Sequence, residues 1–210
     1  MDTIETEGAI RQTPAVLERR RRILAAAIFL FQRKGINGTT AEEIAAEAGV
    51  TKRTLYRHVG SKENLLLAIH EDFINRGLRG WQEIQAAGGS ATERLRRLIV
   101  AHVNTVADEL PSIRIFFEEM KHLSVENQAR IIARRNEYEV ILTDTLREGM
   151  ETGEFRVSDL RITPLALLGS LTEIYRWYQP DGPLGRNELC EFMAKFVMEG
   201  LQDPSTSVSA

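Results

Sequence analysis

The architecture of the first part of the chain follows from the stretch Thr40–Leu66, which reads TAEEIAAEAGVTKRTLYRHVGSKENLL. It holds two short amphipathic segments joined by Ala-Gly-Val-Thr. Because Thr40 and Glu43 have the spacing of a capping box, we expect a helix of about two turns to begin there. Thr51 can cap a second short helix, Lys52–His58. Two short helices with so brief a connection are typical of a helix-turn-helix.

The short helices need support, because neither can bury much apolar surface alone. A helix Pro14–Lys34 is expected before them, and Ser61 can cap another that runs to about Arg79. Gly49 lies in the connection, where a turn commonly requires the left-handed backbone that glycine adopts without steric cost. The pattern therefore predicts a small helical domain, with an ordinary helical hairpin as the alternative interpretation.

The helix Lys52–His58 is unusually polar, since Leu55 is its only strongly apolar side chain directed inward. Such a helix suits the DNA major groove, where Arg and Lys bond the guanine edge and a Thr methyl packs on thymine. Side chains further along would reach the phosphates. The residues that this hypothesis assigns to DNA are Thr39, Thr40, Thr51, Lys52, Arg53, Thr54, Tyr56, Arg57, His58 and Lys62.

Charge is distributed unevenly along the 210 residues, although the formal net charge is only -3. Residues 10–62 hold 11 Lys or Arg against 4 Asp or Glu, whereas residues 63–210 hold 16 against 23. A basic module joined to an acidic remainder indicates that the module meets an anionic partner. A chance clustering of solvated charges is the alternative.

Composition excludes several classes of protein. With 43% hydrophobic and 27% charged residues, the chain is typical of a globular protein, and its one cysteine, Cys190, cannot close an internal disulfide. No apolar run approaches the roughly 20 residues of a membrane span, and the first ten residues are too acidic for a signal peptide, so we expect a cytoplasmic protein. We find no motif for a metal, a cofactor or a catalytic group, and we do not expect an enzyme.

The rest of the chain predicts a second, larger helical domain. Its expected helices are Thr92–Glu109, Pro111–His122, Val125–Glu151, Pro164–Tyr178 and Arg186–Leu201. The expected organisation is all-α: residues 1–12 disordered, 13–60 a helix-turn-helix DNA-binding domain, 61–80 a connecting helix, 81–203 a larger helical domain, and 204–210 a disordered tail.

The last two expected helices have apolar faces wider than a helix with one solvent-exposed side requires. They predict a homodimer interface, with plain core packing as the alternative. The candidate interface residues are Leu165, Leu168, Gly169, Thr172, Leu189, Phe192, Met193 and Phe196.

The inner faces of three earlier helices could line a mostly apolar cavity with a few polar groups, which suits a hydrophobic ligand with a polar end. For each residue taken singly, core packing is the alternative. The candidate ligand-binding residues are His102, Phe116, Phe117, Met120, Arg135, Tyr138, Leu142 and Thr145.

The stretch Arg20–Phe73 resembles the DNA-binding domain of the TetR family of bacterial transcriptional regulators. The resemblance rests on Thr40, Ile44, Ala45, Ala48, Gly49, Val50, Thr54, Leu55, Tyr56, His58, Ser61, Lys62, Glu63, Leu65 and Leu66. Val59 stands where the family usually has Phe, and Arg53 where a small residue is frequent. Arg53 therefore puts an extra guanidinium where base contacts are made.

The resemblance implies a ligand-responsive repressor that binds a palindromic operator as a homodimer and releases it when a small molecule enters the larger domain. The end of the chain, Gly169–Leu201, is similar to family members that respond to acyl-coenzyme A thioesters in fatty-acid or steroid breakdown. A DNA-binding regulator that responds to a protein partner, or to no ligand, is the alternative.

Overall fold

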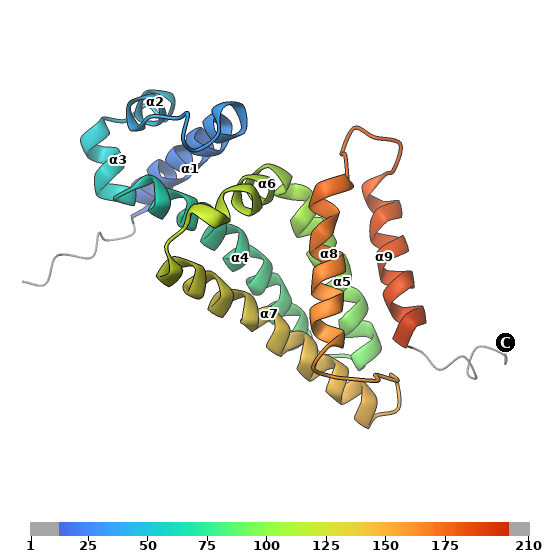
Figure 1. The fold of residues 1–210 in the computed structure, drawn as a ribbon. Helices are drawn as coiled ribbons and strands as arrows, with labels where there is room; N and C mark the ends of the chain where they lie inside the picture. Colours follow the sequence, from blue (N-terminus) through green and yellow to red (C-terminus); the bar gives the residue numbers. More distant parts are fainter. Residues whose placement is uncertain (1–12, 202–210) are drawn as a thin grey trace, which may run out of the picture. The chain divides into compact units, whose positions relative to one another are not determined.

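The computed structural model describes residues 13–201, and within that range the chain is helical without a strand, which confirms the all-α prediction (Figure 1). The elements are α1 Pro14–Lys34, α2 Ala41–Glu47, α3 Lys52–Val59, α4 Lys62–Ala87, α5 Ala91–Asp108, α6 Leu110–Glu119, the 3-10 helix η1 Met120–His122, α7 Val125–Glu151, α8 Thr163–Trp177 and α9 Arg186–Leu201. The two segments expected to be disordered, 1–12 and 204–210, lie outside the described residues.

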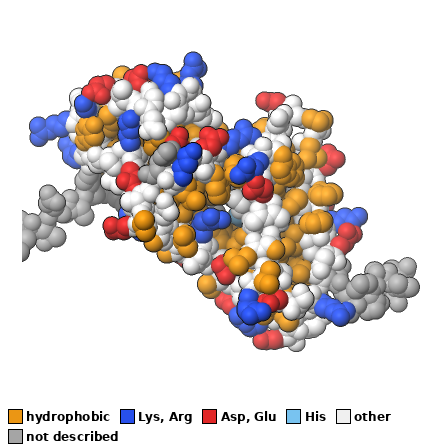
Figure 2. All heavy atoms as spheres, in the orientation of Figure 1, with side chains coloured by type: hydrophobic (Ala, Val, Ile, Leu, Met, Phe, Trp, Pro, Cys, Tyr) orange, Lys and Arg blue, Asp and Glu red, His pale blue; other side chains and the backbone are white. Residues whose placement is uncertain are grey.

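Charged side chains are spread over the face shown in Figure 2. Among residues 13–201, no helix combines the length and the apolar character needed to cross a membrane.

The chain forms two compact units, and the division between them falls between Ala68 and Ile69, inside α4. In the first unit, α2 packs against both α1 and α3. Its core is built from the apolar residues that the helical spacing places inward: Ile23, Leu24, Ala27, Leu30, Phe31, Ile44, Ala45, Leu55, Leu65 and Leu66.

Local signals in the sequence place the helix ends of this first unit. The Thr40 hydroxyl accepts a hydrogen bond from the Glu43 backbone N–H, and the Glu43 carboxylate accepts one from the Thr40 backbone N–H, so the expected capping box is present. Thr51 caps α3 through the Thr54 N–H at 3.1 Å. Gly49 has φ of 62°, the left-handed conformation expected for the connection.

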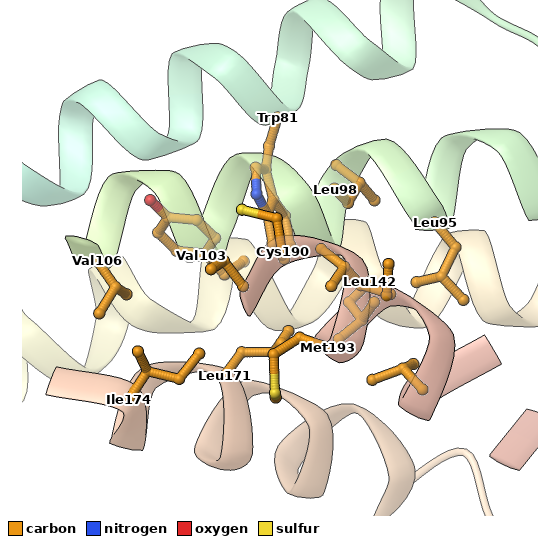
Figure 3. Close-up of a cluster of buried hydrophobic side chains, with 14 of the residues drawn as sticks. Trp81, Leu95, Leu98, Val103, Val106, Leu142, Leu171, Ile174, Cys190 and Met193 are labelled. Atoms are coloured by element: carbon orange, nitrogen blue, oxygen red, sulfur yellow. The ribbon is translucent and has the colours of Figure 1, made fainter. Parts of the chain in front are cut away.

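The second unit is organised around α5, which contacts α6, α7, α8 and α9. Figure 3 shows apolar side chains of α4, α5, α7, α8 and α9 meeting in one cluster. Its labelled members are Trp81, Leu95, Leu98, Val103, Val106, Leu142, Leu171, Ile174, Cys190 and Met193. Cys190 is buried in this cluster, where it packs as a small apolar residue.

Two expected helix ends were wrong. The helix expected to end near Arg79 continues to Ala87, because Trp81 is 1% exposed and its burial outweighs the cost of about 1 kcal/mol for Gly80 in a helix. The helix expected to end at His122 ends at Glu119, and the chain then tightens into η1.

Two helical glycines provide a test of this packing. A Cβ on Gly149 of α7 would overlap the buried ring of Phe155, whereas a Cβ on Gly80 of α4 has no atom within 4 Å. Gly149→Ala should therefore lower the free energy of unfolding by about 1–3 kcal/mol, because overpacking outweighs the gain in helix propensity. Gly80→Ala, the matched control, should raise it by up to about 1 kcal/mol. Urea denaturation measures both, and stabilisation of both variants would contradict the packing.

Candidate functional site

The helix α3 has one inward and several outward side chains. Leu55 is 2% exposed and holds the helix against the unit, while Lys52, Arg53, Tyr56 and Arg57 are exposed. The exposed side therefore carries three cations and one aromatic ring with a hydroxyl group. These are groups that can bond base edges or phosphates without first being released from a core.

The cations of α3 differ in what already binds them. The Lys52 ammonium pairs with the Glu42 carboxylate of α2, which lowers the pKa of Glu42, and it lies 5.9 Å from the centre of the Tyr56 ring. Arg53 and Arg57 make no ion pair within the described part of the chain. An anion that bound Lys52 would therefore compete with Glu42, whereas neither guanidinium group has such a competitor among the described residues.

Three other predicted DNA contacts have roles inside the fold. Thr39 is buried, and its hydroxyl donates to the Gly35 carbonyl at 2.9 Å; its contact with DNA stays a prediction that would require this hydroxyl to be released. The Thr40 hydroxyl is exposed but is part of the capping box described above. The Lys62 ammonium donates to the Ile36 carbonyl at 3.1 Å.

The remaining predicted contacts lie at the two ends of α3. The hydroxyl groups of Thr51 and Thr54 lie 2.9 Å apart at its start. At its end, burial lowers the pKa of His58, with further contributions from the charges of Arg19, Arg57 and Arg20. The structure thus gathers α1 arginines near the end of α3. The sequence alone does not place these arginines there, because a spacing along α1 does not show which helix it faces.

The second unit contains a cavity of about 290 Å³, of the size of a small ligand site. It is lined from α4, α5, α6, α7 and α8 by His70, Phe73, Ile74, His102, Ile113, Phe116, Phe117, Ile132, Arg135, Asn136, Tyr138, Glu139, Leu165, Leu168, Gly169 and Thr172. Five of the eight predicted ligand-binding residues are among them: His102, Phe116, Phe117, Arg135 and Tyr138.

The other three predicted ligand-binding residues do not line this cavity. Leu142 is 1% exposed in the apolar cluster, and the buried Thr145 hydroxyl accepts a hydrogen bond from the Gln85 side chain at 2.6 Å. Met120 lies in η1. Helical spacing placed them on an inward face. An inward face several turns long can line a cavity along one part of its length and pack in the apolar core along another.

Two buried histidines, His70 and His102, are among the polar residues that line the cavity. The Nε2 atom of His102 lies 3.1 Å from the Thr172 hydroxyl, and the His70 ring stacks on Phe116 with ring centres 3.6 Å apart. Burial, with a smaller contribution from the Arg135 charge, lowers the pKa of His70 to about 3 and that of His102 to about 4. Both imidazoles are therefore neutral near pH 7, and each offers one hydrogen-bond donor and one acceptor.

Sequence reasoning missed three polar residues of this cavity, Asn136, Glu139 and His70, of which His70 is the buried one. It follows Ile69 and precedes Phe73 on the inner face of α4, and it is as buried as His102. A polar residue on an apolar helix face is the signal that could have found it, since that same signal singled out His102 on α5.

The residues predicted for a dimer interface fall into three groups. Leu189 and Met193 are buried within the unit, while Leu168 and Thr172 are half-buried and line the cavity. The exposed members are Leu165 and Gly169, which also line the cavity, and Phe192 and Phe196. Apolar side chains lie along α8 and α9 in Figure 2.

Two family models match the chain. Residues 23–69 match the model for bacterial regulatory proteins of the tetR family, and residues 88–201 match the tetracyclin repressor-like C-terminal domain. The chain belongs to the TetR family. The resemblance seen in the sequence is thereby confirmed, and it extends to the larger domain.

Several TetR-type regulators are similar over most of their length. The HTH-type transcriptional repressor KstR2 of Mycolicibacterium smegmatis is 29% identical over 87% of this chain and 90% of its own. The TetR family regulator PfmR of Thermus thermophilus has a TM-score of 0.77 and 32% identity, over 87% and 100%. AibR, solved with isovaleryl coenzyme A and operator DNA, has a TM-score of 0.74 and 29% identity, over 85% and 97%.

These relatives are transcriptional regulators. In the described part of the chain, no group of three or more His, Cys, Asp or Glu side chains could hold a metal ion.

The neutral state of His102 predicts an acid-sensitive stability. Because the folded-state pKa lies below the ordinary value, the unfolded chain takes up the proton first as the pH falls. The stability is fully present above about pH 6.5 and is lost toward pH 4. Between pH 7 and 5 this residue alone should lower the free energy of unfolding by about 2 kcal/mol. Urea denaturation should show that His102→Gln loses less stability over this interval than the unmodified chain, and equal losses would refute the assignment.

Proposed function

We propose that the chain is a ligand-responsive transcriptional repressor that binds a palindromic operator as a homodimer through α3. The observation that carries the proposal is the division of α3 between the buried Leu55 and the exposed Lys52, Arg53, Tyr56 and Arg57. A dimer would place two copies of α3 in successive major grooves, about one helical turn apart. AibR supports this interpretation, because it was solved with operator DNA.

The cavity of the second unit is the proposed effector site. Its wall is mostly apolar, and the polar groups of His70, His102 and Arg135 interrupt it. A hydrophobic small molecule, including the acyl part of an acyl-coenzyme A thioester, fits this chemistry. The isovaleryl coenzyme A of the AibR complex supports the thioester class. A cavity also favours this proposal over a regulator without a ligand.

Repression and ligand binding are linked in this proposal. A ligand that weakens operator binding by a given factor must itself be bound more weakly by that factor when operator is present. Ligand binding is therefore expected to favour a conformation with low affinity for DNA, and the protein leaves the operator.

The proposed homodimer would use the exposed faces of α8 and α9. Leu165, Phe192 and Phe196 are 54%, 63% and 59% exposed, and the rings of Phe192 and Phe196 are stacked with centres 6.2 Å apart. Large apolar side chains clustered in this way are typical of an interface.

DNA binding is tested by fluorescence anisotropy with duplexes from the DNA that flanks the gene. Arg53→Ala should weaken binding by about 1–3 kcal/mol on the operator and far less on a scrambled duplex, because Arg53 would contact a base. Lys62→Ala should weaken all duplexes alike and reduce the salt dependence by about one unit. Since Lys62 also bonds Ile36, circular dichroism must first show that the variant is folded.

Two results would count against the proposal. Absence of salt-dependent binding to any flanking duplex would refute the repressor. Equal losses on every duplex from both variants would refute the division between base and phosphate contacts.

The dimer is tested by sedimentation of Phe196→Glu. A charge on this face should shift the chain toward monomer, because burying an unpaired carboxylate in an interface is costly. Val140→Glu is the matched control: Val140 is 58% exposed on α7, outside the proposed interface, and should stay dimeric. If both variants sediment like the unmodified protein, the interface lies elsewhere.

A further inference from the structure

The cavity holds nitrogen atoms that have no partner within the described chain. The Nε2 atom of His70 and the Nδ1 atom of His102 are buried and make no hydrogen bond, and both side chains are only 5% exposed. A buried polar atom left unpaired costs stability, and native proteins contain few of them. Both histidines line the cavity, but the unpaired nitrogens lie beneath its surface, so a ligand reaches them only if the imidazole rings turn.

Arg135 differs from the other arginines of α7. Arg130 pairs with Glu71, Arg134 with Glu137 and Arg147 with Asp144. Arg135 has no ion pair among the described residues, and its guanidinium lies 5.7 Å from the centre of the Phe117 ring, which also lines the cavity. The Arg135 side chain as a whole is exposed, but partial burial of its guanidinium lowers its pKa, and its charge acts on both His70 and His102. One partly desolvated positive charge and two neutral imidazoles thus share this cavity.

The cavity also contains one acid, Glu139, one helical turn after Arg135. It forms no ion pair with Arg135 in the described structure, and its negative charge opposes that of an incoming anion. Arg135 is therefore the group from which a preference for anions must come, and Glu139 limits how strong that preference is.

We propose that the cavity binds an anionic amphiphile, with Arg135 bonding its anionic oxygen and the imidazoles of His70 and His102 as further hydrogen-bond partners. The anionic oxygen belongs to a carboxylate or a phosphate, and the apolar body packs among Phe73, Phe116 and Leu168. At about 30 Å³ for each water-sized group, a volume of about 290 Å³ holds on the order of ten non-hydrogen atoms. This inference rests on the proposed function and specifies its effector.

The test is isothermal titration calorimetry of the full chain, without DNA, with three probes of equal chain length: octanoate, octan-1-ol and octanoyl-coenzyme A. A charge-assisted hydrogen bond predicts that octanoate binds at least about tenfold more tightly than octan-1-ol. Arg135→Gln should remove this preference and leave octan-1-ol binding unchanged. Arg135→Lys should keep part of it, because the charge remains while the two-pronged geometry is lost.

Arg147→Gln is the matched control, since it removes the same charge from the same helix at a residue that does not line the cavity. It should leave all three affinities unchanged. Circular dichroism and a urea titration show whether the Arg135 variants are folded, and Arg135→Lys keeps the test decisive if Arg135→Gln is not.

Each outcome decides the proposal. Tight binding of octanoate that depends on Arg135 supports it with a carboxylate as the anion. Tight binding of octanoyl-coenzyme A alone, also dependent on Arg135, supports it with a phosphate as the anion. Equal affinity for octan-1-ol, an Arg135→Gln variant that keeps the preference, or no binding of any probe up to about 1 mM overturns it.

The two proposals can fail separately. Because the titration contains no DNA, a failure here leaves operator binding by α3 intact. Conversely, an anion that binds through Arg135 but does not release the operator refutes the release step and leaves the assignment of the cavity standing.

Discussion

The burial of Leu55 is the constraint on which the DNA-binding part of the molecule depends. α3 has eight residues and one fully buried side chain, so a single apolar contact, together with the Thr51 cap, fixes its orientation. Because only Leu55 is buried, the other sides of the helix are available to Lys52, Arg53 and Tyr56. It also explains why α2 is needed: its buried Ile44 and Ala45 supply the apolar surface that α3 lacks. A more apolar α3 would be more stable alone but would have fewer groups with which to bind DNA.

Features set by residues close together in the sequence were predicted, whereas features set by contacts between distant residues were not. Helix ends at Thr13, Thr40, Thr51 and Ser61 were predicted because each is set by a cap within a few residues. The end of α4 was not, because the contacts that keep it helical past Gly80 are made by Trp81 with residues far along the chain. Helix propensities include the cost of Gly80 but not the burial of Trp81, which offsets that cost.

The two candidate sites differ in the same respect: the exposed surface of α3 depends on local sequence, and the cavity depends on contacts between distant helices. The exposed residues of α3 follow from one buried position and the period of a helix. The cavity does not, since it is formed where five helices leave space between them, and no single helix shows that space. Leu168, Gly169 and Thr172 illustrate the difficulty: helical spacing placed them on the dimer face, and the structure shows that they line the cavity. One face of α8 can line the cavity at some positions along the helix and a dimer interface at others, and the sequence alone does not distinguish these positions.

The position of α4 gives a physical reason why the two proposed activities can be linked. The residues of α4 up to Ala68 belong to the first unit, and Leu65 and Leu66 are buried there, whereas His70, Phe73 and Ile74 line the cavity of the second unit. Leu66 and His70 are four residues apart, which is about one helical turn. In the proposed function, a ligand that repositioned His70 would therefore act on the same continuous helix that contributes Leu65 and Leu66 to the core of the first unit. In the proposed function this continuous helix would carry the coupling, because its residues belong to both units.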